Sequence, residues 1–449
     1  MTKRSVLLPL PVAALALLLA SCGGQVEGDA AVEATAGSGT TAEDNDEDHA
    51  HDDDHDHEES HDHEEGHDHG AGHSDDARST AESAGASPRL GVTFDGGVLV
   101  LDAMTLEVLG DFPADGFLRL NPAGDGRHFL VTEGDAFRVL DAGAWSEPHG
   151  DHDHSYTTEP LLTDQSFAGD HPGHVVHHGG RTVLFHDGTG QIDVFDPADL
   201  SSTALPHLAE FATPEAHHGV AVVLSDDSLL HTVGNEDSRS GAVVLDASGD
   251  EVAASHECPG VHGETVAADE VVVLGCEDGV LLYGDGEFHK VSAPDAYGRS
   301  GNLAGSEESP VVLGDYKTDP DADLERPTSV ALIDTRSQEL TVVDLPASYS
   351  FRSLGRGPGG AALVLGTDGT LRSLDPETGE VTAETAVVSE WEEPEDWQAP
   401  RPTLRVQGNF GYVTEPATST LHVVDLTTAE VIDSTTLPVV PNELSSVTG

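Results

Sequence analysis

The sequence predicts an all-β fold made of repeated four-stranded units, and three observations support this prediction. From Leu90 onward, short apolar runs are broken by Gly, Asp, Asn and Pro, and no amphipathic helical pattern interrupts them. A run of alternating apolar residues that ends in Asp recurs eight times. Successive copies lie 39 to 55 residues apart, which is the length of one four-stranded blade of a β-propeller.

The copies of this repeat give the expected number of blades. They are Val98–Asp102, Phe137–Asp141, Ile192–Asp196, Val243–Asp246, Leu281–Asp285, Ala331–Asp334, Leu371–Asp375 and His422–Asp425. An Asp at this position opens the turn between the two outer strands, because its side chain bonds the backbone two residues on. Eight copies predict eight blades, and seven blades with one degenerate copy is the alternative.

The two ends of the repeat region predict how the ring closes. The first copy, from Leu90 to Phe112, has room for only three strands, and residues 439–447 are left over after the last copy. We expect this C-terminal segment to supply the innermost strand of the first blade, which leaves no open sheet edge there. The propeller is therefore predicted over residues 89–449.

The N-terminus has the pattern of an export signal. Lys3 and Arg4 precede an apolar run too short for a comfortable transmembrane helix, and the run ends in Leu19-Ala20-Ser21-Cys22-Gly23. This resembles a bacterial lipobox, which predicts a signal peptide over residues 1–21 and a lipid on Cys22. An ordinary secretory signal with an incidental Cys is the alternative. We expect an extracytoplasmic protein tethered to the membrane at Cys22, because no later segment is long and apolar enough to span a bilayer.

Residues 22–88 are predicted to be a disordered linker, because almost no large apolar side chain is present to offset the ordering entropy. The centre of this tail alternates His with Asp or Glu, a pattern that indicates metal binding. Its candidate ligands are His49, His51, His55, His57, His61, His63, His67, His69 and His73.

Charge and cysteine content limit the partners and the compartment. The formal net charge of −64 over 449 residues excludes nucleic acid and favours a cation partner, although a solvated acidic surface also explains it. With Cys22 used by the anchor, Cys258 and Cys276 remain, and a disulfide is the default in an oxidising compartment. Thiolate metal ligands are the alternative.

The most informative pattern is a match between histidines and blades. His174, His218 and His262 are separated by 44 residues each time, one blade length, and each opens a predicted innermost strand. Equivalent strand starts lie on one rim of a propeller, so we expect the three imidazoles to face one another at a single mouth of the channel. Zinc takes three or four N, O or S ligands in a roughly tetrahedral shell, and this register would deliver them.

Further candidates surround this predicted site. His177 follows in the first of these strands, and His186 and His231 end the second strands of two blades, where a structural role explains them equally well. The insertion His149-Gly150-Asp151-His152-Asp153-His154 is similar to the tail and is expected to fold over the mouth. His152, His154 or Glu264 would then complete the shell. Imidazole and carboxylate suit Zn²⁺, and also Ni²⁺, Cu²⁺ and Co²⁺.

The tail, the predicted propeller and the segment His256–Glu264 together resemble the zinc metallochaperones of the AztD type. The resemblance implies an exported protein, not an enzyme, that delivers Zn²⁺ to the solute-binding protein of an ABC zinc importer. The lipid anchor departs from a freely diffusing chaperone and suggests a partner on the same membrane. A metal-dependent hydrolase or oxidoreductase with Glu264 as base, or an interaction scaffold with a metal-buffering tail, is the alternative. We expect a monomer.

Overall fold

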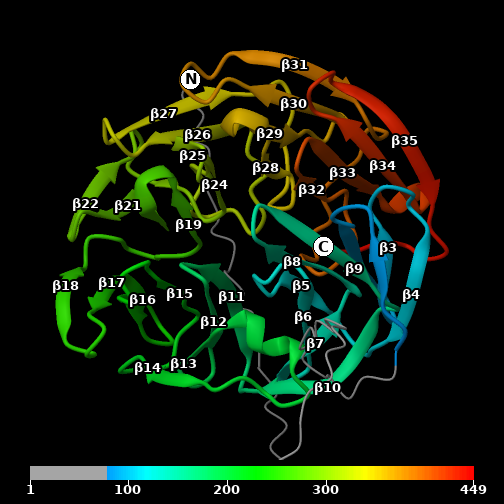
Figure 1. Cartoon of the computed structure of the whole chain (residues 1–449). Helices are drawn as coiled ribbons and strands as arrows, with labels where there is room; N and C mark the ends of the chain where they lie inside the picture. The colour runs from blue at the N-terminus through cyan, green and yellow to red at the C-terminus, as the bar shows by residue number, and fades with distance from the viewer. Residues whose placement is uncertain (1–77) are drawn as a thin grey trace, which may run out of the picture. The chain divides into compact units, whose positions relative to one another are not determined.

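The structure, a computed structural model, describes residues 78–449, and strands dominate this part of the chain. Eight of its sheets contain a path of four antiparallel strands, and within most of them the strands follow one another in sequence. Figure 1 shows these sheets around a common centre, with β5, β11, β15, β19, β24, β28 and β32 nearest to it. The all-β prediction is confirmed, and the arrangement is consistent with a propeller.

The first four sheets cover the chain up to Ser255, apart from one strand that comes from the C-terminus. The first sheet contains β36 (Leu444–Val447), β2 (Arg89–Phe94), β3 (Gly97–Asp102) and β4 (Val108–Pro113). The second contains β5 (Arg119–Pro122), β6 (His128–Glu133), β7 (Ala136–Asp141) and β10 (Leu161–Ala168). The third contains β11 (Pro172–His178), β12 (Arg181–His186), β13 (Gln191–Phe195) and β14 (Ala209–Ala212). The fourth contains β15 (Ala221–Val223), β16 (Leu229–Gly234), β17 (Arg239–Leu245) and β18 (Glu251–Ser255).

The next four sheets follow in chain order. The fifth contains β19 (Glu264–Ala267), β20 (Val271–Cys276), β21 (Asp278–Gly284) and β22 (Glu287–Ser292), with β23 (Gly298–Arg299) beside β21. The sixth contains β24 (Leu303–Ser306), β25 (Ser309–Asp315), β26 (Ser329–Asp334) and β27 (Glu339–Asp344). The seventh contains β28 (Leu354–Arg356), β29 (Ala362–Leu365), β30 (Thr370–Leu374) and β31 (Val381–Ala386). The eighth contains β32 (Leu404–Gln407), β33 (Phe410–Glu415), β34 (Thr420–Asp425) and β35 (Glu430–Thr436).

A smaller sheet lies outside this repeat. It contains β1 (Ala81–Ser83), β9 (His152–Thr157) and β8 (Ala144–His149). The helical segments of residues 78–449 are short 3₁₀ turns: η1 (Pro197–Ser201), η2 (Ala268–Glu270), η3 (Pro358–Gly360) and η4 (Pro416–Thr418). No helix in the described part of the chain has the length and apolar character needed to cross a membrane.

The repeated Asp has the predicted role in the turns. It accepts a hydrogen bond from the backbone N–H two residues on at Asp102, Asp141, Asp196, Asp246, Asp334, Asp375 and Asp425. Asp285 is the exception and takes a left-handed backbone conformation, with φ of 52°. These turns connect equivalent strands in the same way, and so keep equivalent strands of different sheets in corresponding positions.

The predicted closure of the ring is confirmed. The C-terminal strand β36 pairs antiparallel with β2, and Arg89 lies opposite Val447. The closure is reinforced at Glu443, whose backbone N–H donates to the Thr93 hydroxyl at 2.9 Å and whose carboxylate contacts Arg352 at 3.1 Å. The first and last residues of the repeat region therefore complete a single sheet.

The ends of the innermost strands define two faces of the ring, which we call the starting face and the ending face. On the ending face, the backbone N–H of Gly449, just after β36, donates to the carbonyl of Gly126 at 2.9 Å. Thr182, where β11 turns into β12, donates to the carbonyl of Ala123 on the same face. His174 lies near the start of β11, and His218 and His262 lie in the segments just before β15 and β19, so all three are on the starting face.

The N-terminal boundary differs from the expectation. Residues 78–88 were predicted to belong to the disordered linker, but they contain β1, which pairs with β9, and Arg78 bonds Asp141 at 2.6 Å. The prediction failed because the exposed edge of the β9 insertion strand offers backbone partners that composition does not reveal. The predicted signal peptide 1–21, Cys22 and the tail histidines lie outside the described residues.

Candidate metal centre

Three histidines from neighbouring sheets converge on the starting face, as their register predicts. The Nε2 atom of His218 lies 3.4 Å from Nε2 of His174 and 3.2 Å from Nε2 of His262. One ligand atom of each residue lies within 4.8 Å of the other two. A tetrahedral zinc with Zn–N bonds of about 2.0–2.1 Å separates its ligand atoms by roughly 3.3 Å, so these spacings fit a shared zinc ion.

The opposite nitrogen of each imidazole lies near an oxygen atom, which is close enough for a hydrogen bond in two of the three rings. Nδ1 of His218 lies 2.5 Å from the Asp187 carboxylate. Nδ1 of His262 lies 2.7 Å from the Gly301 carbonyl, and Nδ1 of His174 lies 3.4 Å from the Glu264 carboxylate. Acceptors of this kind around ligating histidines fix the ring orientation and the tautomer.

These partners determine which nitrogen of each ring is available. A carbonyl or carboxylate only accepts, so Nδ1 of His262 and of His218 carries the proton and donates it. In the neutral form that binds metal, the rings present lone pairs at Nε2, and two such lone pairs face each other across 3.2 Å. This arrangement is repulsive unless a cation lies between the nitrogens. The donor set therefore fits a divalent metal bound through Nε2.

His262 is the most protected member of this group, which we call the rim site. Burial, followed by the charge of His174, lowers the pKa of the His262 imidazole to about 3. A neutral imidazole is the form that binds metal, so His262 stays ready to act as a ligand throughout the mildly acidic range.

Packing holds the three sheets of the rim site together. One hydrophobic cluster joins Phe185 of β12, Leu230 of β16 and Leu274 of β20, and all three side chains are buried. Each such side chain contributes about 1.5–3 kcal/mol of burial free energy. The histidines therefore project from a rigid platform rather than from independent loops.

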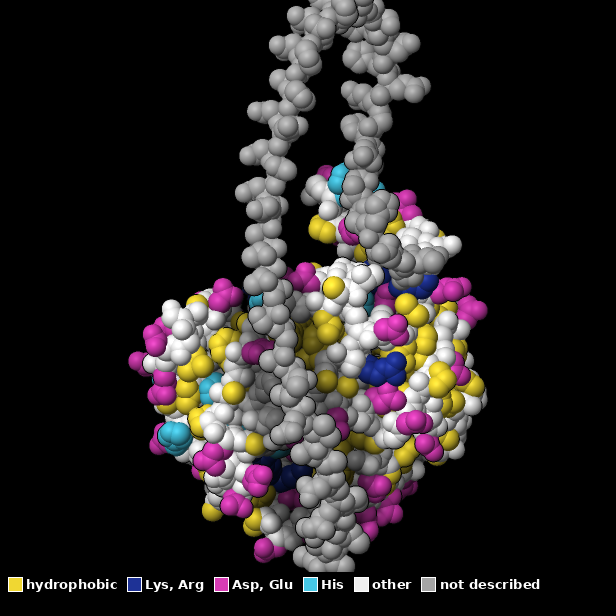
Figure 2. Space-filling model, turned by 90° about the horizontal axis from the view of Figure 1, so that it is seen from below, with side chains coloured by type: hydrophobic (Ala, Val, Ile, Leu, Met, Phe, Trp, Pro, Cys, Tyr) yellow, Lys and Arg dark blue, Asp and Glu magenta, His cyan; other side chains and the backbone are white. Residues whose placement is uncertain are grey.

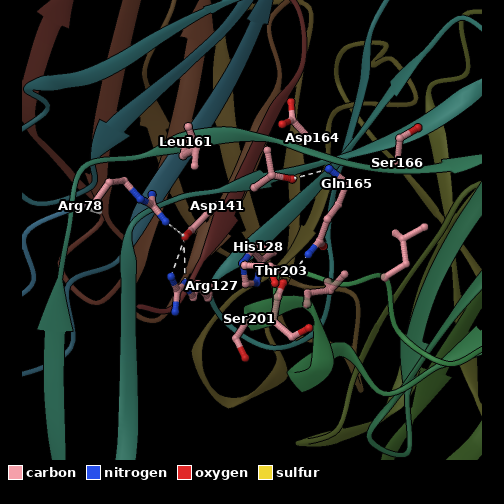
Figure 3. Close-up of a pocket in the computed structure, with 14 residues that line it drawn as sticks. Arg78, Arg127, His128, Asp141, Leu161, Asp164, Gln165, Ser166, Ser201 and Thr203 are labelled. Carbon is pink, nitrogen blue, oxygen red and sulfur yellow. Dashed lines mark hydrogen bonds and ion pairs between the residues drawn. The ribbon is translucent and has the colours of Figure 1, made fainter. Parts of the chain in front are cut away.

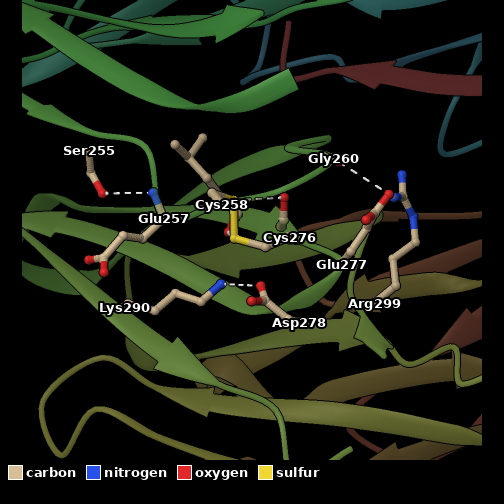
Figure 4. The surroundings of a disulfide bond; sticks show 11 residues. Ser255, Glu257, Cys258, Gly260, Cys276, Glu277, Asp278, Lys290 and Arg299 are labelled. Atoms are coloured by element: carbon tan, nitrogen blue, oxygen red, sulfur yellow. Dashed lines mark hydrogen bonds and ion pairs between the residues drawn. A yellow bond between two sulfur atoms is a disulfide. The ribbon is translucent and has the colours of Figure 1, made fainter. Parts of the chain in front are cut away.

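A disulfide fixes the segment that precedes His262 (Figure 4). Cys258 and Cys276 are bonded, with their Cα atoms 4.9 Å apart, and both are buried. The pairing joins the loop before β19 to the end of β20, and the backbone N–H of His262 donates to the Gly275 carbonyl at 3.0 Å. The expected disulfide is thus present in the structure, close to a predicted ligand, and the thiolate-ligand alternative does not apply.

The rim site opens into an acidic cavity. A cavity of about 470 Å³ lies beside His218 and is lined in part by Glu236, Asp237 and Glu277, with Arg239 as a single cation. The His218 side chain is 41% exposed, whereas that of His174 is 25% exposed. Carboxylates around an opening raise the local cation concentration. Figure 2 shows that acidic side chains also predominate over basic ones across one side of the surface.

Three other predicted ligands lie away from the rim site. His177 is three residues further along β11 and pairs with Thr182, so it lies about 10 Å towards the ending face. His186 is buried, bonds Asp193 at 2.9 Å and packs against Phe137. His231 is buried inside β16 rather than at its end, and its Nδ1 lies 2.9 Å from the carbonyl of Thr232. The structure gives His186 and His231 structural contacts.

The insertion does not fold over the rim site. His152 and His154 form a separate group with His149 on the β8–β9 hairpin. The hairpin leaves the ring after β7 on the ending face, where Ser146 of β8 donates to the Gly449 carbonyl at 3.1 Å. The expectation that His152 or His154 completes the rim shell is wrong, because β7 ends on the face opposite to the three rim histidines. Only Glu264, of the expected additions, contacts a rim histidine.

Asp187, which contacts Nδ1 of His218, is a residue of the rim site that was not predicted from the sequence. It follows His186 at the end of β12, and this strand end lies on the starting face beside His218 of the next sheet. The signal was available, because the repeat register brings the end of a second strand next to the start of the neighbouring innermost strand. The contact with the Gly301 carbonyl could not be predicted in this way, because every residue has a backbone carbonyl.

A further cavity lies at the base of the hairpin (Figure 3). It has a volume of about 470 Å³, and Arg78, Arg127, His128 and Asp141 line one side. Both arginines contact the Asp141 carboxylate at 2.6 Å. Burial alone would raise the pKa of Asp141, but these hydrogen bonds hold it below its usual range. The two arginines and Asp141 thus form an ion cluster in this wall, and the cluster anchors Arg78.

Comparison with known proteins gives a relative of the same architecture. No family model matches the chain. The zinc chaperone AztD of Citrobacter koseri is 27% identical over 343 residues, which cover 74% of this chain and 79% of the relative. The crystal structure of Citrobacter koseri AztD matches with a TM-score of 0.70 and 25% identity, covering 81% of this chain and 99% of that one. The structure of apo AztD from the same organism also has a TM-score of 0.70, at 23% identity, covering 81% and 98%.

Proposed function

We propose, from the premise that this chain resembles AztD-type zinc chaperones in sequence and fold along most of its length, that it is an extracytoplasmic zinc metallochaperone. Zn²⁺ is its cargo, and the solute-binding protein of an ABC zinc importer is its recipient. The observation that carries the proposal is the convergence of three Nε2 atoms, with acceptors bonded to Nδ1 of His218 and His262 and the Glu264 carboxylate 3.4 Å from Nδ1 of His174.

The roles of the rim residues follow from their contacts. His174, His218 and His262 each bind the ion through Nε2, and Asp187 and Glu264 hold the outer nitrogens of two of these rings. Three protein ligands leave one tetrahedral position for water or for a ligand of the recipient. Release then proceeds by ligand exchange, in which a donor of the recipient enters the open position before the rim histidines leave.

The exposure of the ligands sets an order for this exchange. The side chain of His218 is 41% exposed and that of His174 is 25% exposed. His218 also borders the acidic cavity. His262 is held by the adjoining disulfide and by Gly301. We infer that His218 leaves first and His262 last, because a side chain with fewer packing contacts reorients more readily.

The proposed layout of the whole protein extends this reading. A signal peptide over residues 1–21 and a lipid on Cys22 would tether the chain outside the cell membrane. Residues 22–77 would gather zinc through nine histidines, and the eight four-stranded sheets would be the eight blades of a monomeric propeller. A membrane-tethered recipient would then meet the chaperone by diffusion in two dimensions.

A second function class has one observation in its favour. A catalytic zinc needs an open position and a nearby base, and Glu264 is a carboxylate beside His174. Glu264 however lies 3.4 Å from Nδ1 of that ring, where it would orient the imidazole. We therefore infer that the protein is not an enzyme.

The proposal is tested by zinc binding and transfer. The full chain is loaded with one equivalent of zinc and mixed with the apo solute-binding protein, and zinc on each protein is measured after separation. His262→Ala should weaken zinc binding at least tenfold and lower the amount transferred, whereas His207→Ala, at an exposed histidine outside the register, should change neither.

The outcomes separate the candidate functions. Tight binding without transfer to the recipient, together with zinc-dependent hydrolysis of ester or peptide substrates, would replace the chaperone by an enzyme. Equal zinc affinity in the His262→Ala and His207→Ala proteins would reject the rim site and leave a scaffold with a metal-buffering tail.

A further inference from the structure

A second group of histidines occupies the tip of the β8–β9 hairpin. His149 and His152 are paired across the strands, with Gly150 and Asp151 between them as the turn. Gly150 has φ of 67°, a conformation that suits glycine in so tight a turn. His152 and His154 are two residues apart on β9, so they share one face of the strand. The hairpin geometry alone brings the three imidazoles together.

The ligand atoms of this group repeat the arrangement of the rim site. Nε2 of His152 lies 3.2 Å from Nε2 of His154, and one ligand atom of each of the three residues lies within 4.8 Å of the others. Carboxylates again hold the outer nitrogens: Asp151 lies 3.2 Å from Nδ1 of His152, and Glu82 lies 3.1 Å from Nδ1 of His154. These partners leave the Nε2 lone pairs directed at one another, where a cation relieves their repulsion.

The location of the group separates it from the rim site. The hairpin rises from the ending face, and its base contacts the C-terminus through Ser146. Glu82 belongs to β1, which pairs with β9 and is the first strand of the described chain. The last tail histidine, His73, is eight residues before Ala81. At about 3.3–3.6 Å per residue, at most roughly 29 Å of chain separates His73 from Ala81.

We infer that His149, His152 and His154 form a second zinc site, on the face of the ring opposite to the rim site and beside the attachment of the histidine-rich N-terminal segment. Its ligand class is three imidazoles, which take Zn²⁺ or another borderline divalent ion. The inference stands independently of delivery to an importer, because it concerns a metal site that does not share a residue with the rim site.

The two sites differ in exposure, and this gives them different expected affinities. The side chains of His152 and His154 are 57% and 37% exposed, and Glu82 is 65% exposed. An exposed hairpin tip forfeits more side-chain entropy on binding than ligands held by a packed core. The hairpin site should therefore bind zinc more weakly and exchange it faster than the rim site. Weak binding and fast exchange suit a site that receives zinc from the adjoining segment.

Zinc titration of the full chain tests the inference, provided that the tail does not contribute. The nine tail histidines are replaced by Gln, and zinc is titrated against a competing chelator. Two equivalents should bind. His152→Gln/His154→Gln should remove the weaker equivalent, and His218→Ala/His262→Ala should remove the tighter one. His171→Gln/His207→Gln, which alters two exposed histidines in neither group, should leave both equivalents in place.

Crystals of the same protein soaked in zinc give an independent readout. An anomalous zinc peak should lie between the three hairpin imidazoles, and it should vanish in His152→Gln/His154→Gln crystals. One equivalent before and after the hairpin change, with no peak at the hairpin, would overturn the second site and leave the rim site intact. Loss of both equivalents in the hairpin variant would also overturn it, because the two groups would then not be independent.

Discussion

Replacement of Asp187 tests whether the acceptors around the rim site contribute to zinc affinity. Asp187 holds Nδ1 of His218 at 2.5 Å, and its other oxygen lies 3.4 Å from the backbone N–H of Gly219. Asp187→Asn keeps an oxygen acceptor for the ring but removes the charge, whereas Asp187→Ala removes the acceptor. The two variants therefore separate charge from hydrogen bonding.

The size of the effect follows from these contacts. Changes to acceptors behind ligating histidines cost about 10–100-fold in metal affinity. Asp187 is 22% exposed, so solvent screens part of its charge. We expect Asp187→Asn to weaken zinc binding about tenfold, roughly 1.4 kcal/mol, and Asp187→Ala to approach 100-fold. Chelator competition with the tail histidines replaced by Gln measures both values.

Asp170→Asn is the matched control. Asp170 lies in the loop before β11 and pairs with His171, so the control removes the same charge near the same face without touching a rim histidine. If Asp170→Asn weakens zinc binding as much as Asp187→Asn, the effect is one of overall charge. If neither Asp187 variant differs from the unchanged protein, the assigned tautomer of His218 is wrong.

Three further outcomes are expected. Cys258→Ser/Cys276→Ser should lower the free energy of unfolding by about 3 kcal/mol in denaturant titrations and weaken rim zinc binding, with unchanged affinity counting against a positioning role. Burial lowers the pKa of His231, so its contribution to stability is full above about pH 6.5 and is lost as the pH falls further. His231→Met should therefore reduce the slope of the unfolding free energy against pH by up to about 1.4 kcal/mol per pH unit. An unchanged slope would contradict this. Removing residues 439–449 deletes β36 and should abolish cooperative thermal unfolding followed by circular dichroism, whereas a preserved transition would mean that closure contributes little.

The repeat explains why so much of the rim site could be predicted from the sequence. The repeat places equivalent residues of successive blades around a ring, so three histidines that recur every 44 residues, each at the start of an innermost strand, are expected to meet on one face. The same argument predicted that the C-terminal strand completes the first sheet, and β36 does so. Neither conclusion needed side-chain detail.

The position of the insertion could not be predicted from the repeat. Residues 142–160 have no counterpart in the other sheets, so no register fixes the direction in which they leave the ring. Because these residues are similar to the tail, they were expected to fold over the mouth that carries the rim histidines. The chain instead leaves β7 on the opposite face. The pairing of β1 with β9 was missed for a related reason, because a strand can be recruited by an exposed edge without any apolar pattern of its own.

The late position of the closing strand has a consequence for how the protein is made. Glu443 and Thr93 are 350 residues apart, so their contact is among the last that a growing or translocating chain can form. The third to fifth sheets, which carry the rim histidines, are contiguous in sequence and need only local pairings. The metal-binding sector is therefore expected to assemble before the circle is complete. A chain cut short before residue 444 would then retain its zinc ligands while leaving β2 with an unpaired edge, and cellular quality control would meet it as a metal-binding species that is prone to aggregate.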